Sequence, residues 1–488
     1  MPRLPIQLDT TSGEPLYAQL RQALEHCIAA GIFAEDERLP SSRQLATELG
    51  VSRNTVTTAY QQLLADGCVE SYPRSGLFVN PEMRALPALD QDGPPVRGGF
   101  SWTELLGSRE TTGSRRLAKP VRWFEYPYPF VGGQVDLEAF PTWAWARALR
   151  KALEDEHLPF SIHDGQSADD PLLVELICRK ILPTRGVEAA PSQVLITIGS
   201  QQGLDLVATT LLGAGRAIAV ENPGYPDAFQ VFTRSNAELV PVPVDEAGMV
   251  LSAALPGVDV VYTTPSHHYP TNATLSAPRR RRLLAMAQHR GLVIVEDDYD
   301  SEFRYQGRPQ PAVKSMDTTG QVVYLGSFSK FLAPGLRLGF VVAAPELIER
   351  LRELRRDRVR HPPGHLQRAL ALLLQSNGYQ RSVRRARARL RQRWSVCVAS
   401  LRQHLEWPVH APAGGVSIWV AGPAELDANR LADDLRPRGV LIEAGDVCFL
   451  EATPPRNFFR LGYGAIALEA IEPGVRLIAD AWRRQLAA

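Results

Sequence analysis

The stretch Gly326-Ser327-Phe328-Ser329-Lys330-Phe331-Leu332-Ala333-Pro334-Gly335-Leu336-Arg337-Leu338-Gly339-Phe340 follows the apolar run 322–325. It places a lysine beside two hydroxyl groups, with an arginine seven residues later. A lysine at a strand end that is crowded by a second cation can lose its proton and act as a nucleophile. Hydroxyls and a guanidinium nearby suit a phosphate, which arginine can bind through two hydrogen bonds.

Together these groups predict a pocket in which Lys330 forms a Schiff base with pyridoxal 5'-phosphate (PLP). The alternative is a solvated lysine that follows a strand. The surrounding sequence, from about residue 125 to residue 488, alternates short apolar runs with helical patterns. This alternation predicts an α/β domain with a mostly parallel sheet, helices on both faces and ligands at the carboxyl ends of the strands. The expected strands are 194–197, 217–220, 258–262, 292–295, 322–325 and 340–342.

Three further stretches come after expected strands and fit such a pocket. The turn 199–203 opens a helix whose backbone N–H groups can bind a phosphate, although it is equally an ordinary strand-to-helix turn. Tyr225 offers an aromatic face to a pyridine ring, or is a core or rim tyrosine. In the run Glu296-Asp297-Asp298-Tyr299 a carboxylate can bond the ring nitrogen and Tyr299 the ring hydroxyl; the alternative is a helix-capping acid cluster.

Near the C-terminal end, Arg460 lies within an apolar segment that resembles a strand. A guanidinium there suits the carboxylate, or another anionic group, of an amino-acid ligand. The alternative is a structural ion pair.

The first 80 residues differ in character and predict a compact helical module. A helix is expected to begin near Pro15 and end near Gly31. A short helix capped by Ser41 or Ser42 and a second capped by Ser52 would form a helix-turn-helix, with Val56, Tyr60, Leu63 and Leu64 facing the core. Residues 68–72 and 77–79 flank a turn that contains Arg74, which predicts a β-hairpin wing.

The charge of this module does not by itself indicate a nucleic-acid partner. Residues 1–80 contain six arginines, no lysine and nine acidic residues, a net charge of −3. A DNA-binding module would therefore need a local basic face, with the acids elsewhere. The alternative is a small helical protein-binding domain.

Composition bounds the remaining possibilities. A chain of 488 residues implies more than one domain. The segment 81–124, rich in Gly and Pro, is interpreted as a linker between a domain at 12–80 and a domain at 125–488.

The five cysteines form no close pair, which excludes a CxxC metal or redox site and suits a reducing cytoplasm. No metal site, secretory signal or membrane span is predicted. The arginine runs at 279–282 and along 381–393 are interpreted as solvated helix faces.

The first module closely resembles the winged helix of GntR-type regulators over about residues 14–80. The resemblance rests on Leu39-Pro40-Ser41-Ser42-Arg43, Val51-Ser52-Arg53-Asn54-Thr55-Val56, Ala59-Tyr60 and the Ser75-Gly76 wing. It implies binding to double-stranded DNA, with Arg43 and Arg53 reading bases or phosphates. The residues expected to contact DNA are Arg43, Ser52, Arg53, Asn54, Thr55 and Arg74.

The second part resembles a fold-type-I aminotransferase, and this resemblance implies a role for each residue of the expected pocket. Lys330 would be the Schiff-base lysine, Asp297 would face the ring nitrogen and Arg460 the acid group of the ligand. The remaining contacts would be Ser200, Gln201, Ser327 and Arg337 for the phosphate, Tyr299 for the ring oxygen and Tyr225 for the ring face. The choice of Asp297 over Asp298 rests on the family pattern, because composition cannot decide between them.

Both parts together resemble the MocR/GabR class of regulators, with 264–271 and 296–303 as characteristic stretches. The resemblance implies a homodimer, with domains exchanged head to tail, that senses an amine or amino acid by aldimine exchange at Lys330. The cysteines and the lack of an apolar span predict a cytoplasmic location with no membrane association. At most a weak or partial transaminase half-reaction would remain. The alternatives are an active aminotransferase with an accessory DNA-binding module, and a DNA-binding scaffold that does not use PLP.

Four positions depart from the family pattern. Asn272 stands where glycine is frequent, and His268 where many members have glutamine, so His268 is expected beside the ligand with altered hydrogen bonding. Ile162 replaces the tyrosine that reaches the phosphate of a neighbouring subunit in related enzymes. Asp227 replaces an arginine of some relatives, so the identity of the ligand should not be inferred from those relatives.

Overall fold

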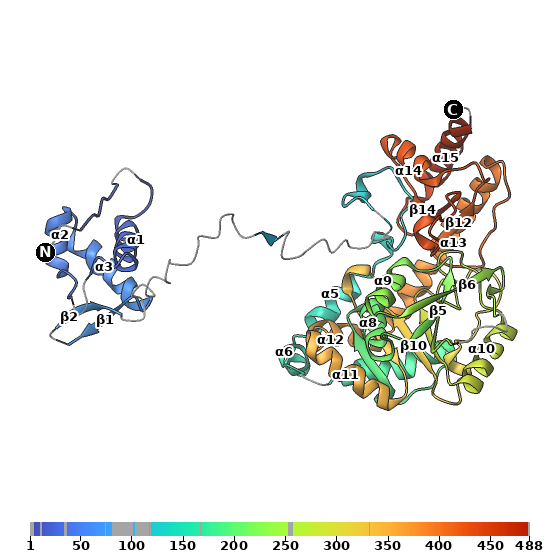
Figure 1. Cartoon of the computed structure of the whole chain (residues 1–488), viewed down its shortest axis with the longest axis horizontal. Coiled ribbons are helices and arrows are strands. Elements are labelled where there is room, and N and C mark those ends of the chain that lie inside the picture. The colour runs from blue at the N-terminus through green and yellow to red at the C-terminus, as the bar shows by residue number, and fades with distance from the viewer. Residues whose placement is uncertain are drawn as a thin grey trace. The chain divides into compact units, whose positions relative to one another are not determined.

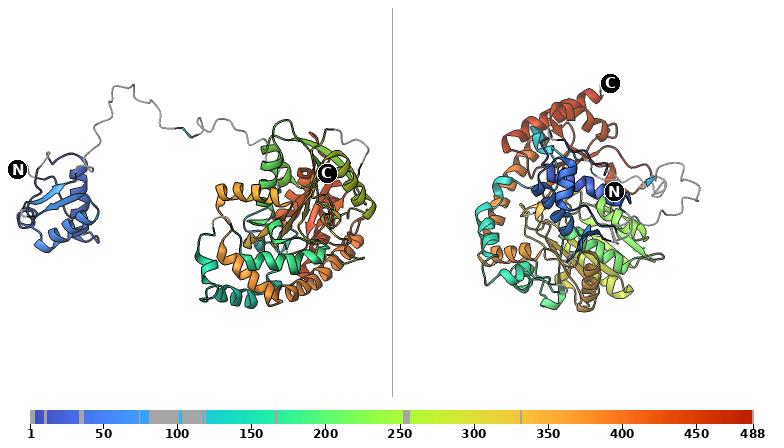
Figure 2. Two further views of the ribbon diagram at one scale, coloured as in Figure 1. Left: turned by 90° about the horizontal axis from the view of Figure 1, so that it is seen from below. Right: turned by 90° about the vertical axis from the view of Figure 1, so that its left-hand side faces the viewer.

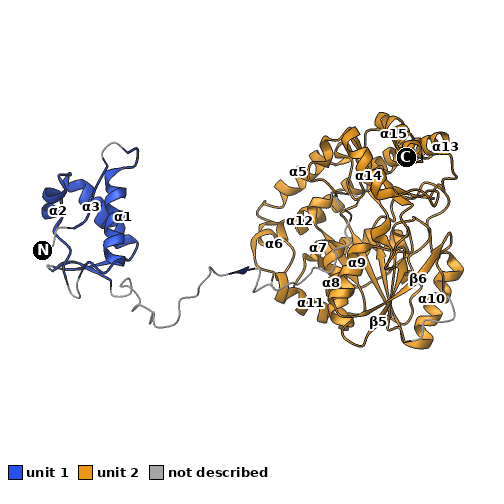
Figure 3. Ribbon diagram, turned by 45° about the horizontal axis from the view of Figure 1, so that its top comes forward, with its two compact units in different colours: residues 1–110 blue, residues 111–488 orange. Residues whose placement is uncertain are grey.

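The computed structural model describes residues 4–9, 12–33, 37–73, 75–80, 101–102, 117, 119–165, 168–251, 257–330 and 332–486. The chain divides into two compact units, residues 1–110 and 111–488 (Figure 3). The division falls inside the expected linker 81–124, most of which lies outside the described residues, so the extent of the linker stays a prediction. None of the described helices is both long enough and apolar enough to cross a membrane.

The described part of the smaller unit contains three helices, α1 (Leu16–Ala29), α2 (Ser42–Leu49) and α3 (Arg53–Ala65). The hydroxyl of Ser41 accepts a hydrogen bond from the N–H of Gln44 at 3.2 Å, and that of Ser52 accepts one from the N–H of Thr55 at 3.1 Å. Helices α2 and α3 therefore each begin at a serine that satisfies an otherwise unpaired backbone donor. The expected helix-turn-helix is confirmed.

A two-stranded hairpin completes the winged helix. β1 (Val69–Tyr72) pairs antiparallel with β2 (Gly76–Val79), as expected, while Arg74 at the tip lies outside the described residues. The core of this unit is built from Val56, Ala59, Tyr60 and Leu63 together with apolar residues of α1 and α2. The prediction that Leu64 faces the core is wrong, because its side chain is 36% exposed. Positions 56, 59, 60 and 63 share one helix face, and residue 64 is turned past its edge.

An eight-stranded sheet forms the centre of the larger unit (Figure 1), in the order β4-β11-β10-β9-β8-β5-β6-β7. Strands β10, β9, β8, β5 and β6 are parallel to one another, whereas β11 runs antiparallel to β10 and β4. The mostly parallel sheet is confirmed. The bounds of the strands are β4 Val194–Thr197, β5 Ala217–Asn222, β6 Glu238–Asp245, β7 Gly248–Met249, β8 Val260–Thr263, β9 Val293–Asp298, β10 Val322–Ser327 and β11 Gly339–Val342.

Strand β6 is absent from the strands expected from the sequence, because Pro241 and Pro243 interrupt its apolar pattern. Proline is tolerated at this place because β6 is nearly an edge strand, covered beyond β5 only by the two-residue strand β7.

Helices cover both faces of the sheet (Figure 2). On one face, Val220 and Tyr262 pack in a cluster with residues of α8, α9 and α11. On the other, Ala219 and Val261 pack with residues of α10. The bounds of the helices are α5 Thr142–Lys151, α6 Leu158–Ile162, α7 Pro171–Leu176, α8 Gly199–Leu211, α9 Pro226–Arg234, α10 Ala277–Arg290, α11 Pro345–Val359, α12 Gly364–Gln375, α13 Gly378–His404, α14 Ala428–Leu435 and α15 Ile471–Leu486.

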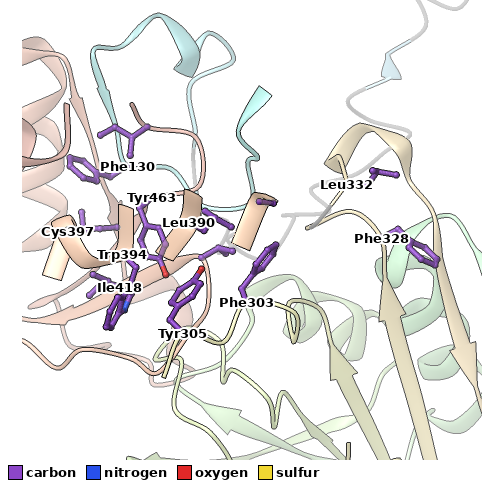
Figure 4. Close-up of a cluster of buried hydrophobic side chains, with 14 of the residues drawn as sticks. Phe130, Phe303, Tyr305, Phe328, Leu332, Leu390, Trp394, Cys397, Ile418 and Tyr463 are labelled. Carbon is purple, nitrogen blue, oxygen red and sulfur yellow. The ribbon is translucent and has the colours of Figure 1, made fainter. Parts of the chain in front are cut away.

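The C-terminal part adds a small antiparallel sheet of β12 (Ser417–Ala421), β15 (Phe458–Gly462) and β14 (Glu443–Ala444). Strand β13 (Val440–Leu441) pairs with β3 (Tyr128–Pro129), which ties the start of this unit to its end. A large hydrophobic cluster joins these elements to the loop that carries Lys330. Phe328 and Leu332, on either side of the lysine, belong to the same cluster as Phe130 and Trp394 (Figure 4).

The interpretation of the arginine runs as solvated faces is wrong at two positions. Arg280 is 1% exposed and donates hydrogen bonds to the carbonyl oxygens of Leu275 and Pro265. Arg393 is also buried and donates to Asp136 at 2.9 Å. Both guanidinium groups find acceptors inside the protein, which makes their burial tolerable.

Candidate functional site

The loop after β10 holds Lys330 at the carboxyl end of the sheet. Its ammonium nitrogen Nζ lies 5.9 Å from the centroid of the Tyr299 ring. Gly133 faces the same nitrogen, and a Cβ there would come within 3.2 Å of it. Burial, and then the Arg460 guanidinium, lower the pKa of the Lys330 amine. A larger fraction of the amine is therefore unprotonated and nucleophilic than for an exposed lysine.

Asp297 lies near the end of β9 and is 5% exposed. Its Oδ2 accepts a hydrogen bond from the Tyr262 hydroxyl at 3.0 Å. Its other oxygen, Oδ1, is buried and has no hydrogen-bond partner among the described residues. Burial raises the pKa of Asp297 to about 7. This buried acceptor is available to a group from outside the chain, and so is Oδ1 of Asp298, which also has no partner among the described residues.

The next residue, Asp298, forms a buried ion pair. Its Oδ2 accepts hydrogen bonds from Arg185 and from the Tyr324 hydroxyl, both at 2.7 Å. Burial alone would raise the pKa of Asp298, but the Arg185 guanidinium holds it below its ordinary value. Side chains alternate along a strand, so only one of the two acids faces the pocket. The structure therefore favours Asp297, which the sequence alone could not decide.

The start of helix α8 lies beside the guanidinium of Arg337. Ser200 and Gln201 lie in the first turn of the helix, and no side chain caps its backbone N–H groups. Nη2 of Arg337 lies 3.3 Å from the carbonyl oxygen of Ile198, and a Cβ on Gly199 would come within 3.2 Å of the guanidinium. A helix N-terminus and a guanidinium at one place suit a phosphate group.

Ser327 lies close to Lys330 in sequence, at the end of β10. Its hydroxyl accepts a hydrogen bond from the N–H of Ser329 at 3.1 Å and can still donate one. The structure therefore places Ser327 on the lysine loop, and its contact with a phosphate stays a prediction.

Aromatic side chains lie near these groups. The rings of Tyr225 and Tyr269 lie 5.0 Å apart between centroids, and those of Tyr269 and Tyr299 lie 6.5 Å apart. The hydroxyl of Tyr225 lies 3.1 Å from Oδ2 of Asp227 and 3.4 Å from Oε1 of Gln201. Tyr225 is thus brought next to the first turn of α8, and its ring is available to stack on a flat ligand.

His268 is buried, and its role as a ligand contact stays a prediction. It is 1% exposed, and Nδ1 lies 2.7 Å from the hydroxyl of Thr271. Its Nε2 lies 3.7 Å from Oε2 of Glu221, which is too long for a hydrogen bond. Burial lowers the pKa of His268, which favours a neutral ring.

Arg460 on β15 forms the ion pair that was the structural alternative for this residue. Nη1 lies 3.0 Å from Oε2 of Glu443, the residue opposite it on β14. Nε donates to the hydroxyl of Ser417 at 2.9 Å, and the guanidinium carbon lies 4.7 Å from the centroid of the Tyr269 ring. Arg460 nevertheless acts on the pKa of Lys330, so the ion pair lies at the pocket and not apart from it.

Sequence reasoning missed Tyr262, Tyr269, Ser417 and Glu443. Tyr269 belongs to a stretch that is characteristic of the family, and its position after β8 could have indicated a pocket residue. Glu443 carries no such signal, because it meets Arg460 only through the pairing of two short strands.

In the smaller unit, the side chains of Arg43, Arg53 and Asn54 are exposed, as DNA contacts require. Nε of Arg53 lies 3.4 Å from the hydroxyl of Ser42, so the start of α3 lies beside the start of α2. The Ser52 hydroxyl caps α3 and also lies 2.8 Å from that of Thr55. The predicted contribution of Arg74 lies outside the described residues.

The residues of the larger unit fit PLP. The unpartnered oxygen of Asp297 suits a protonated ring nitrogen, and the uncapped start of α8 beside Arg337 suits the phosphate. Lys330 supplies an amine of lowered pKa in the same pocket.

Comparison with protein families agrees with both units. Bacterial regulatory proteins of the gntR family match residues 16–79, and aminotransferases of class I and II match residues 138–476. The HTH-type transcriptional regulator TauR of Rhodobacter capsulatus is 43% identical over 472 residues, which cover 96% of each chain. The chain belongs to the MocR/GabR family of HTH-type transcriptional regulators.

Other relatives match either nearly the whole chain or the larger unit. The probable rhizopine catabolism regulatory protein MocR of Rhizobium meliloti is 33% identical over a match that covers 97% of this chain and 95% of that relative. Among solved structures, the α-aminoadipate aminotransferase LysN of Thermus thermophilus, in complex with N-(5'-phosphopyridoxyl)-L-leucine, is 30% identical with a TM-score of 0.72. The match covers 80% of this chain and all of LysN, so the likeness concerns the larger unit.

One departure from the MocR/GabR pattern has a structural reason. Asn272, in place of glycine, has a φ of +59°, a conformation that asparagine tolerates better than most residues. Its side chain is buried and donates a hydrogen bond to the carbonyl oxygen of Ser417 at 2.7 Å. The substitution therefore preserves the turn and adds a bond to the residue that holds Arg460.

Proposed function

We propose that this protein is a transcription regulator that holds PLP on Lys330 and uses it to sense an amine or amino acid. The observation that carries the proposal is the union, in one chain, of a winged helix with a pocket that contains Lys330, Asp297 and Arg337. When bound, PLP supplies an electrophilic carbon that reacts with primary amines. Lys330 provides the covalent attachment, Asp297 the partner of the ring nitrogen and Arg337 the partner of the phosphate.

Binding of the ligand must change the affinity for DNA if the protein is a sensor. A ligand shifts an equilibrium between two arrangements only when it binds them unequally. The test is to screen amines and amino acids for a change in the absorbance of the bound cofactor, and then to measure DNA affinity with each compound that responds. If compounds change the absorbance at full occupancy and none of them changes DNA affinity, the sensor function is contradicted.

The proposal includes a homodimer that acts on DNA in the cytoplasm. Leu137 and Trp143 of the larger unit are 85% and 82% exposed, and Ile162 is also exposed. Large exposed apolar side chains are typical of surfaces that another protein covers, and a second copy of the chain is the occupant that a regulator of this family suggests.

The second candidate is a working aminotransferase. The likeness of the larger unit to LysN and to a multiple substrate aminotransferase of Thermococcus profundus, which is 26% identical with a TM-score of 0.72, favours it. Sustained turnover with an amino donor and a keto acid would support this function, whereas a single half-reaction would not.

Replacement of Arg53 by alanine should weaken DNA binding about ten- to a hundredfold, because an arginine that contacts a base or phosphate contributes roughly 1–3 kcal/mol. The dependence on salt should become less steep if the contact is to a phosphate. The measurement is a titration of labelled operator DNA at several salt concentrations. Arg21→Ala is the matched control, because Arg21 pairs with Glu25 and with Asp66 at the opposite end of α3. An equal loss in both variants would point to general charge and not to a contact by Arg53.

Replacement of Asp297 by asparagine should weaken PLP binding by roughly ten- to a hundredfold, because a hydrogen bond to a charged group contributes about 1.5–3 kcal/mol. An asparagine NH2 group that faces the protonated ring nitrogen cannot accept a hydrogen bond from it. The measurement is a titration of the cofactor-free protein with PLP, followed by absorbance. Asp205→Asn, on α8 and paired with Arg358, is the control and should leave the affinity unchanged. Unchanged affinity in Asp297→Asn would remove Asp297 from the site.

A further inference from the structure

The end of the pocket that would receive an acid group contains a closed ion pair. Arg460 and Glu443 are 4% and 6% exposed, and Nη1 of the arginine lies 3.0 Å from Oε2 of the glutamate. Each therefore neutralises the other in a place that water barely reaches. A guanidinium that waited for a ligand would be expected to lack such a partner.

Both members of the pair are held from several sides. The other oxygen of Glu443, Oε1, accepts a hydrogen bond from the N–H of Gly132 at 2.8 Å. Arg460 donates from Nε to Ser417, and its guanidinium lies over the ring of Tyr269. A Cβ on Gly132 would collide with the guanidinium, so this residue has to be small. Arg460 is thus confined by three neighbours, whereas Glu443 has one bond besides the ion pair.

The pair is electrostatically connected to Lys330 and to the first described residues of the larger unit. Arg460 lowers and Glu443 raises the pKa of Lys330. The same two residues act in the same directions on Lys119, whose pKa is lowered in the first place by partial burial. Leu117, two residues before this lysine, packs against the cluster of Tyr269, Cys448 and Phe449. A change at the ion pair is therefore expected to alter the pKa of Lys330 and that of Lys119.

Building on the proposed function, we propose that Glu443 occupies the place of the ligand's acid group in the ligand-free protein, and that ligands are selected by their ability to replace it at Arg460. The ligand is then an amino acid with an anionic group, and Glu443 is a specificity-determining residue. A second anion beside Glu443 is repelled by it, so the acid group of the ligand and Oε2 of Glu443 compete for Nη1 of Arg460. After the exchange Glu443 keeps its bond to the N–H of Gly132.

This exchange unites the two roles that the sequence left open for Arg460. The residue forms a structural ion pair without ligand and an acid-binding contact with ligand. The exchange also explains how a site can discriminate by repulsion: a weakly binding acid does not displace Glu443, although it would bind a free arginine.

The first test compares two amines that differ only in the acid group, 3-aminopropanoate and propylamine. The change in cofactor absorbance gives a dissociation constant for each compound in the wild-type protein and in Glu443→Gln. Removal of the competing charge should raise the preference for 3-aminopropanoate over propylamine by about tenfold or more. Glu451→Gln, which alters an exposed carboxylate bonded to Asn222, is the control and should leave the preference unchanged.

The second test does not depend on the cofactor reaction. In Glu443→Gln, Arg460 has no anionic partner, so the melting temperature of this variant should fall. Acetate should raise the melting temperature of the variant again by roughly 2–4 °C. Acetate should hardly change the melting temperature of the wild-type protein or of Glu451→Gln. An unchanged preference between the two amines, or an equal effect of acetate on all three proteins, would overturn the proposal and leave Glu443 as a structural residue. If neither amine alters the absorbance of any variant, the sensing of these amines fails, while the acetate result still decides the role of Glu443.

Discussion

Lys330→Ala is expected to abolish the absorbance band of covalently attached PLP and every change of that band on addition of amines. The reason is that a methyl group replaces the amine that the buried loop after β10 holds in the pocket, with its pKa lowered. PLP should still bind through Asp297 and the start of α8, but without a covalent link, so it should be lost on dialysis. The measurement is an absorbance spectrum before and after dialysis.

Lys151→Ala is the matched control, because Lys151 is an exposed residue at the end of α5. Its spectrum should equal that of the wild-type protein. DNA binding by Lys330→Ala should persist without ligand, since the smaller unit has its own core, while the response to amines disappears. A band that survives in Lys330→Ala would contradict the assignment of this lysine.

Asp298→Asn is expected to lower the free energy of unfolding of the larger unit by about 3–5 kcal/mol, the cost of removing one partner of a buried ion pair. The side chain of Asp298 is fully buried, that of Arg185 is 8% exposed, and the two lie 2.7 Å apart. The neutral amide leaves the Arg185 guanidinium without a compensating charge. The measurement is unfolding in urea, followed in the cofactor-free protein so that PLP does not contribute.

Asp297→Asn provides the comparison, because it changes the neighbouring carboxylate to the same amide. That variant should affect PLP binding far more than stability, and Asp298→Asn should show the reverse order. If Asp298→Asn were stable and failed to bind PLP, the two acids would have to exchange roles.

The larger unit was predictable from the sequence because parallel strands bring their carboxyl ends to one edge of a sheet. Lys330, Asp297 and Tyr225 each lie at or just after the end of a short apolar strand, so their meeting could be predicted from local patterns alone. The helix caps were predictable for a similar reason, since a cap and its helix are adjacent in sequence, although Ser41 and Ser42 both stayed open for the first helix. The contacts of these residues with PLP and with DNA stay predictions.

Of the two charged residues at the acid-binding end of the pocket, only one could be predicted from the sequence. Arg460 could be recognised by its place in an apolar segment, but its partner Glu443 is brought opposite to it by the register of two short strands. The difference between Asp297 and Asp298 likewise depends on Tyr262 and Arg185, which are remote in sequence. Such pairings arise from tertiary packing, for which local propensity carries no signal.

Leu117 packs against a cluster that contains a cysteine, so the rate of cysteine labelling can follow the opening of that cluster. Cys448 lies in the same cluster, is 1% exposed, and has a pKa raised by burial, so it reacts with thiol reagents only when the cluster opens. Cys397, buried on α13 in the large hydrophobic cluster, reports wider unfolding instead. The ratio of the two labelling rates therefore compares how often this cluster opens with how often the larger hydrophobic cluster does.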